Sequence, residues 1–334
     1  MNKKILLVNL GSPKSLSTDD VREYLREFLS DDKVIDLPKV IQQFILRAFI
    51  LPFRPAKAKK AYEKIWQKEG SPLIINTQKI ANSLSKKTGW SVDIAMRYQH
   101  PSIADKIKLY KKESIEQVTI IPLYPHSAMS TTQTTIEEIN RIASEVYPEM
   151  DVNFVKPFYD DSNYINALAN SIRPHVKNLD KIVFSYHGIP ERHVDKVYLD
   201  GKPCADHSCE DEINSLNANC YKATCYATTR LLVKALKLKE GSYSTCFQSR
   251  LGRDPWLQPY TDHTIEKLGK EGKKRVLVFS PAFVADCLET TIEIGEEYLE
   301  LFQEHGGKEI QLVPSLNDND DWAEGLYKII KDKL

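Results

Sequence analysis

Short apolar runs alternate with amphipathic patterns of helical spacing along the whole chain. Most of the runs are continuous rather than alternating, which is typical of strands buried on both faces of a parallel sheet. We predict strands at Lys4–Leu10, Val92–Tyr98, Gln117–Tyr124, Asp151–Val155, Lys181–His187, Tyr243–Ser249, Lys274–Phe279 and Glu309–Val313. We predict helices at Thr18–Leu29, Leu73–Lys87, Ser102–Lys112, Thr132–Val146, Tyr164–Val176, Tyr221–Lys237 and Thr290–Gln303.

This alternation predicts an α/β protein made of βαβ units with parallel, doubly wound sheets. Four strands in each half indicate two similar domains, residues 1–158 and 159–320, with a boundary near Pro157–Tyr159. We expect a last helix, Asp321–Leu334, to pack back on the first domain. Ligands of such folds bind at the carboxyl ends of the strands, so motifs directly after strands are the first functional candidates.

Charge and length narrow the class of protein. The 334 residues contain 46 basic and 46 acidic side chains, a balance that does not favour binding to nucleic acid. No stretch approaches the roughly 20 apolar residues of a membrane span. The N-terminal run Ile5–Leu10 is too short for the apolar core of a secretory signal, so we expect a reducing cytoplasm.

His187 stands at the end of a predicted strand, in the sequence SYHGIP. Imidazole titrates near neutral pH, so a histidine at this position can accept protons or bind a metal ion. The alternative is a histidine that only caps the loop after the strand, and position alone does not separate the two.

Glu289, Glu293 and Glu297 follow another strand at spacings of four residues. A helix would place them on one face, where they repel one another unless protons or cations lie between them. A solvated acidic face is one interpretation. A path for cations or protons is the other, and the position after a strand favours it.

Cys204, Cys209, Cys220 and Cys225 lie within one short polar segment. Clustered thiols in a reducing compartment are more often metal ligands than disulfides. A [2Fe–2S] cluster takes four thiolates and is known with a C-x4-C spacing, whereas zinc sites commonly have shorter gaps. We therefore predict a [2Fe–2S] cluster, with zinc as the second choice and four unrelated thiols as the alternative.

Residues 40–62 carry more large apolar side chains than a plain surface helix needs. These are Ile41, Phe44, Ile45, Phe49, Ile50, Leu51 and Phe53, and Arg54, Lys57, Lys59 and Lys60 follow. A core helix with a solvated basic end is one interpretation. The other is an apolar lip for a flat ligand whose acid groups meet the cations, and this lip is also a candidate for contact with a membrane surface.

The whole chain resembles the ferrochelatases. The similarity lies in NLGSP at 9–13, REFLSDDKVIDLP at 26–38, RYQHP at 97–101, PLYPHSAMSTT at 122–132, SYHGIPERH at 185–193, FQSRLGRDPWLQP at 247–259 and FVADCLETTIEI at 283–294. These motifs occur in order over nearly the full length. The resemblance implies two Rossmann-like domains with a porphyrin cleft, and an enzyme that inserts ferrous iron into a porphyrin. Because the apolar lip suits vinyl groups, we expect protoporphyrin IX as the substrate and protohaem as the product, the last step of haem synthesis.

The resemblance also implies roles for individual residues. His187 matches the active-site histidine, and Glu289, Glu293 and Glu297 match the catalytic glutamate and the acidic row behind it. The residues that match cleft-lining or propionate-holding positions are Arg54, Lys57, Arg97, Tyr98, Ser249 and Trp256. Both His187 and Glu289 are candidate ligands of the substrate iron.

Two positions depart from the animal enzymes of the family. Cys287 stands where they have a histidine, and Met129 where they have an isolated cluster cysteine. The four clustered cysteines instead resemble an internal insertion found in some bacterial members. A coproporphyrin or cobalt/nickel chelatase and a non-catalytic haem or iron–sulfur sensor stay as alternatives, and the chain is expected to act as a monomer or homodimer.

Overall fold

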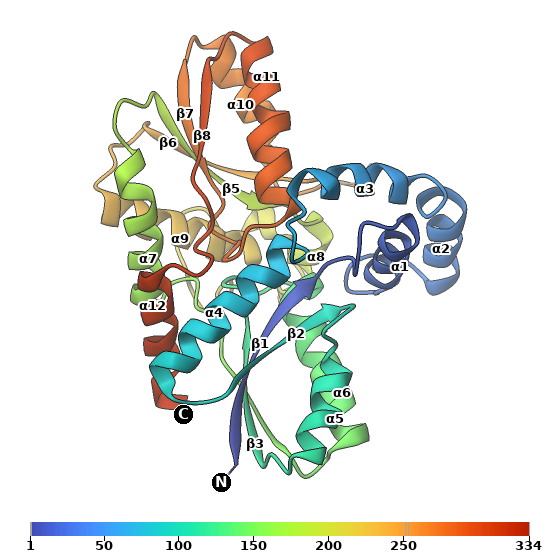
Figure 1. Cartoon of the computed structure of the whole chain (residues 1–334). Helices are drawn as coiled ribbons and strands as arrows, with labels where there is room; N and C mark the ends of the chain where they lie inside the picture. The colour runs from blue at the N-terminus through green and yellow to red at the C-terminus, as the bar shows by residue number, and fades with distance from the viewer. Residues whose placement is uncertain (1, 251, 253, 334) are drawn as a thin grey trace. The chain divides into compact units, whose positions relative to one another are not determined.

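The computed structural model describes residues 2–250, 252 and 254–333, and the chain divides into two compact units (Figure 1). The first unit runs to Tyr124, includes Met129–Lys156 and takes up the chain again from Ile330. The second unit contains Pro125–Ala128 and Pro157–Ile329.

The first unit is built on a parallel sheet with the strand order β2-β1-β3-β4. Its strands are β1 (Lys3–Gly11), β2 (Val92–Tyr98), β3 (Gln117–Pro122) and β4 (Asp151–Phe154). Leu7 of the central strand pairs in register with Ile94 on one side and Ile121 on the other. Its helices are α1 (Thr18–Leu29), α2 (Lys39–Ile45), α3 (Arg54–Ile65), α4 (Pro72–Thr88), α5 (Ile103–Lys112) and α6 (Thr134–Val146), with π-helical turns at Leu46–Ile50 and Met129–Gln133.

The second unit repeats this plan with the order β6-β5-β7-β8. Its strands are β5 (Lys181–His187), β6 (Tyr243–Gln248), β7 (Arg275–Phe279) and β8 (Glu309–Leu312). Its helices are α7 (Ser162–Ile172), α8 (Glu191–Asp195), α9 (Tyr221–Leu236), α10 (Thr261–Lys270), α11 (Tyr298–Glu304) and α12 (Asp320–Ile330), and a π-helix covers Glu289–Glu297 (η5). Short 3₁₀ turns lie at Arg173–His175, Cys204–Asp206 and Lys331–Lys333.

Burial explains the continuous apolar runs. Ile5 to Val8 in β1 have no exposed surface, and neither do Val183, Phe184 and Tyr186 in β5. A strand with neighbours on both sides and helices over both faces has no polar face, so it reads as unbroken apolar sequence. The fold class and all of the predicted strands are confirmed, with ends that differ by a few residues.

The strand order places one position in each sheet where the chain reverses direction across the sheet. In the second unit this point lies between β5 and β7, because β6 pairs on the other side of β5. Open α/β sheets bind their ligands at such points, outside the carboxyl ends of the strands. His187 ends β5, and the segment leading to Glu289 follows β7.

The last helix differs from the prediction. Trp322 of α12 is fully buried, and its ring lies 5.8 Å from that of Phe158 and 5.9 Å from that of Tyr164. The helix therefore packs within the second unit, because its largest apolar side chain fits an aromatic cluster there. Only the chain from Ile330 groups with the first unit, and Leu334 lies outside the described residues.

Candidate functional site

His187 is held in one tautomer by its own loop. Its Nδ1 lies 2.6 Å from the carbonyl oxygen of Gly188, and a carbonyl can only accept, so Nδ1 carries the proton of the neutral ring. Nε2 is left with a lone pair, and no hydrogen bond to it occurs among the described residues. The ring is half-buried and has two aromatic neighbours, Trp256 at 6.5 Å and Phe283 at 6.2 Å between ring centres.

The backbone around His187 is tightly fixed. The Gly188 amide donates to the carbonyl of Gln248 at 2.7 Å, and a Cβ at this glycine would lie 2.9 Å from the same oxygen. A larger residue at position 188 would therefore push β5 and β6 apart. The carbonyl of His187 accepts a hydrogen bond from the Tyr221 hydroxyl at 2.9 Å.

Within the predicted acidic row, the Glu293 carboxylate is the one that accepts several hydrogen bonds from described residues. It accepts hydrogen bonds from the Ser249 hydroxyl, from Gln248 Nε2 at 3.3 Å and from the Tyr298 hydroxyl at 2.7 Å. Burial and then the charge of Glu293 raise the pKa of Tyr298 well above its ordinary value, so this tyrosine stays a donor. Ser249, expected to line the cleft, thus holds Glu293.

The row is less regular than its spacing predicts, because η5 is a π-helix. Glu293 and Glu297 line a cavity of about 500 Å³ together with Asp262, Glu300 and Glu304, whereas Glu289 is not part of its lining. Among the described residues, no lysine or arginine forms an ion pair with Glu289, Glu293 or Glu297. Arg250 also lines the cavity but pairs with Asp262, at 2.8 Å. The remaining carboxylates outnumber this one cation in the lining, and such an excess of negative charge attracts cations.

Arg97 and Tyr98 in the first unit converge on Asp31. Its Oδ2 accepts from the Arg97 guanidinium at 2.7 Å, from the Tyr98 hydroxyl at 2.8 Å and from the Thr134 hydroxyl at 2.5 Å. Burial opposes ionisation of Asp31, but hydrogen bonds led by that of Thr134 outweigh it and lower its pKa. Tyr98 is fully buried, so the structure corrects its expected role: it fixes Asp31 rather than lining a cleft.

The predicted lip is exposed. The large apolar side chains at the surface of this segment are Val40, Ile41, Phe44, Phe49 and Phe53, from 49% to 82% exposed. Arg54 and Lys57 follow on the first turn of α3, both exposed, and neither forms an ion pair among the described residues. The alternative of a core helix is therefore wrong for this face. None of the helices in the described part of the chain is long and apolar enough to cross a membrane.

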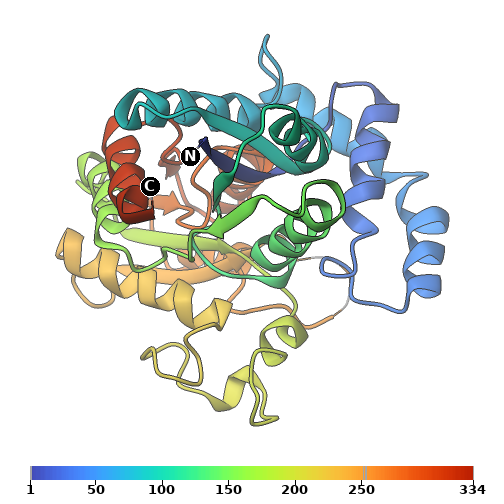
Figure 2. The same ribbon diagram turned by 90° about the horizontal axis from the view of Figure 1, so that it is seen from below.

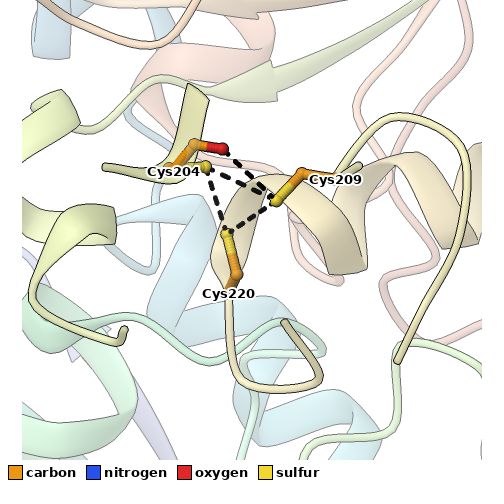
Figure 3. A group of neighbouring side chains, drawn as sticks. All are labelled: Cys204, Cys209 and Cys220. Atoms are coloured by element: carbon orange, nitrogen blue, oxygen red, sulfur yellow. Dashed lines mark hydrogen bonds between the residues drawn. The ribbon is translucent and has the colours of Figure 1, made fainter. Parts of the chain in front are cut away.

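Three of the four clustered cysteines meet (Figure 3). The Sγ atom of Cys204 lies 3.6 Å from those of Cys209 and Cys220, and these two are 3.8 Å apart. All are buried, and hydrogen bonds from the other two thiols lower the pKa of Cys220. Thiolates around one tetrahedral metal ion, with metal–sulfur distances of about 2.3 Å, are separated by about 3.8 Å.

Cys225 is not part of this group. It lies five residues after Cys220 on α9, is fully buried, and its pKa is raised by that burial. Its position in sequence predicted a fourth ligand, but spacing does not reveal the direction of a side chain on a helix.

Sequence reasoning missed several residues that support this site. Asp31 and Gln248 lie inside family-like motifs, whereas Tyr298 and Tyr221 carry no signal beyond their neighbours in sequence. Asp31, Gln248 and Tyr221 act through hydrogen bonds between residues at least 34 positions apart, which only the fold brings together. Tyr298 bonds Glu293, five residues before it in the chain.

Comparisons with known proteins agree with this geometry. A family model described as Ferrochelatase matches residues 2–334. A ferrochelatase of Pseudomonas savastanoi pathovar phaseolicola is 42% identical over 97% of this chain and 96% of its own length, and one of Pseudomonas fluorescens Pf-5 is 42% identical over 96% and 95%. The solved structure of SirB from Bacillus subtilis with Fe³⁺ has a TM-score of 0.53 over 99% of this chain and 95% of its own, at 15% identity, which shows a shared fold.

Proposed function

The chain belongs to the ferrochelatase family, and on this premise we propose that it inserts ferrous iron into protoporphyrin IX to form protohaem. It is a metal-chelating lyase, with porphyrin and ferrous iron as substrates. The observation that carries the proposal for the site is His187, whose Nε2 lone pair lies at the point where the second sheet reverses.

Insertion requires two pyrrole N–H protons to leave the macrocycle while one Fe²⁺ ion enters, so charge balances. We assign the acceptance of these protons to Nε2 of His187, since its other ring nitrogen already donates to Gly188. We assign the delivery of iron to Glu289, Glu293 and Glu297, because carboxylates bind a dication and neutralise its charge. Glu289 is the proposed carboxylate nearest the ring, because it begins η5, the end of this helix that follows β7.

A flat macrocycle does not expose its nitrogen lone pairs to an approaching ion. The protein therefore has to distort the ring on binding. The energy for this distortion comes from contacts with parts of the porphyrin that lie far from the reacting nitrogens. We propose that the exposed apolar lip receives the vinyl side of the porphyrin. Arg54, Lys57 and Arg97 are the proposed partners of the propionates, and Trp256 packs beside His187.

An insertion assay with ferrous iron and protoporphyrin IX under anaerobic conditions tests this proposal. We expect His187→Ala to lose about 10²–10⁴-fold in kcat while remaining folded, because a positioned proton acceptor is removed. His175→Ala is the matched control: it removes another half-buried histidine of this unit, bound to Gln311. Wild-type protein without insertion activity would refute the function, and an active His187→Ala variant would refute the role of His187.

We also propose that the thiol group holds a [2Fe–2S] cluster, with Cys204, Cys209 and Cys220 as three ligands and Cys225 as the fourth. The three buried, converged thiols fit a metal centre. Cys225 lies outside this group but interacts with Cys220, so the proposal requires its side chain to turn toward the other three thiols when the cluster binds. Such a cluster would add order to a segment with little apolar packing of its own.

Iron, sulfide and zinc contents of anaerobically purified protein test the cluster. We expect two iron and two sulfide per chain and a visible chromophore that Cys225→Ser loses. Cys246→Ser is the control, because Cys246 is also buried but lies in β6 outside the thiol group. One zinc per chain, colourless protein and no effect of Cys225→Ser would replace the cluster by a three-thiolate zinc site.

A further inference from the structure

The segment after His187 forms a loop that returns to its own starting point. The chain leaves β5 at His187, passes through α8, Cys204 and Cys209, and returns at Cys220, the residue that caps α9. The next residue is Tyr221, whose hydroxyl donates to the His187 carbonyl at 2.9 Å. Figure 2 shows this excursion as a yellow loop that protrudes beside α9.

The thiol group joins the two arms of this loop. Cys204 and Cys209 lie on the outgoing arm and Cys220 lies on the returning arm, with their sulfur atoms within 3.8 Å of one another. The outgoing arm is anchored near α8, since the amide of Cys204 donates to Asp195 at 2.7 Å. A metal centre on these thiols would therefore tie the first turn of α9 to the loop that leaves His187.

Tyr221 is well placed to transmit this constraint. It is buried, and its ring lies 6.0 Å from that of His126, which is buried as well. Its hydroxyl bonds the backbone carbonyl of His187, and the imidazole of His187 accepts protons in the proposed reaction. The Gly188 carbonyl orients the ring of His187, and Tyr221 fixes the carbonyl of the same residue.

We infer that Tyr221 is a positioning residue for His187, and that a metal centre on Cys204, Cys209 and Cys220 keeps it in place. The thiol site thereby adjusts the rate of iron insertion without touching either substrate. This inference rests on the proposed role of His187 in iron insertion, but it holds for a cluster and for a single metal ion alike.

A double-mutant cycle tests the inference. Tyr221→Phe keeps the ring and removes the hydroxyl, which bonds the carbonyl of His187 and also contacts the thiol of Cys225. We expect kcat to fall roughly tenfold with an unchanged KM for porphyrin, and Cys225→Ala, which removes only the contact with the thiol, to keep the ¹⁵N signals of the His187 ring unchanged. Tyr186→Phe is the matched control, because it removes a buried hydroxyl bonded at the same 2.9 Å to Thr229 instead. It should lower the melting temperature as much as Tyr221→Phe does, while kcat stays at the wild-type level.

The metal is removed by a chelator, and in parallel by Cys204→Ser. We expect loss of the metal to lower kcat in the wild type but not to lower the kcat of Tyr221→Phe any further. The melting temperature should fall in both proteins when the metal is removed. The ¹⁵N signals of the His187 ring should shift on metal removal only when Tyr221 is present, which is independent of turnover. Equal effects of metal removal with and without the hydroxyl, or wild-type kcat in Tyr221→Phe, would overturn the inference.

Discussion

At the scale of single residues, the glutamates of the acidic row look equivalent in the sequence, but their hydrogen-bond partners differ in the structure. Glu293 has three hydrogen-bond donors around it, whereas the Gln248 amide reaches only the backbone carbonyl of Glu289, at 3.3 Å. Spacing indicated the row, but it could not show which side chain is already engaged by the protein.

Glu289→Gln and Glu293→Gln are expected to fail in different ways. The first should lose at least about 10²-fold in kcat and keep its stability, because an amide cannot take a proton or neutralise iron. The second should be less impaired in turnover but lose about 1–3 kcal/mol of unfolding free energy, since its NH₂ group faces donors. Insertion kinetics and chemical denaturation of both variants measure this, and identical behaviour would contradict it.

His126 should make the stability of the protein depend on pH. It is fully buried, its Nε2 bonds Thr228, and burial lowers its pKa to about 3 from 6.5. Below pH 6.5 only the unfolded chain takes up this proton, so stability falls as pH falls toward 3, by on the order of 2 kcal/mol between pH 7 and 5.

Denaturation at pH 7 and pH 5 checks this loss. His126→Gln should show a smaller decrease than the wild type, while the exposed His263→Gln should show the wild-type decrease. The same pH dependence in all three proteins would show that another group is responsible.

At the scale of elements, strands were easier to predict than helices that do not cover a sheet. The strands are continuous apolar runs, and Thr18–Leu29 has the matching pattern of a surface helix with Ser17 as its cap. The apolar residues of α2 are largely exposed. The spacing of apolar residues therefore could not predict which face of this helix is buried. Instead a single buried glutamine fixes α2.

Gln42 anchors α2 and the lip. It is 1% exposed, and its Nε2 donates to the carbonyls of Asp31 at 3.1 Å and Ile35 at 3.0 Å. Gln42→Ala should cost about 1–3 kcal/mol of unfolding free energy and raise the KM for porphyrin, because the carbonyls of Asp31 and Ile35 lose the side-chain donor that ties them to α2. The Asp31 carbonyl keeps its backbone donors, the amides of Val34 and Ile35. Gln43→Ala is the control, as that neighbour makes one hydrogen bond, at 3.2 Å to Ser30. Equal effects of the two substitutions would argue against an anchor.

At the scale of the whole molecule, the resemblance identified the family, and charge balance excluded classes of partner. We propose that the choice of porphyrin depends on the lip. The lip offers Ile41, Phe44 and Phe49 at the surface, which suit vinyl groups. We therefore expect a higher kcat/KM for protoporphyrin IX than for coproporphyrin III, whose two further propionates would be desolvated without enough partners. Parallel kinetics with both porphyrins measure this preference, and a clear preference for coproporphyrin III would reverse the assignment.

The same surface is our proposed contact with the cytoplasmic face of a membrane. Its exposed phenylalanines lie close in sequence to Arg54 and Lys57, a composition that favours anionic lipid surfaces. In a sedimentation assay, the wild type should pellet with vesicles that contain phosphatidylglycerol, whereas the double variant Phe44→Ser/Phe49→Ser should stay in the supernatant. Binding that is equal for both proteins would remove the lip from membrane contact.

The four residues Pro125–Ala128 have a consequence for how the chain is made. They belong to the second unit although they leave the ribosome before β4 of the first, and His126 precedes its partner Thr228 by 102 positions. His126 therefore cannot make its native contacts with Tyr186, Tyr221 and Thr228 until α9 has been synthesised. A fragment that starts at Pro157 would carry a hole in place of this imidazole, so the second half cannot be cut out as a complete folding unit.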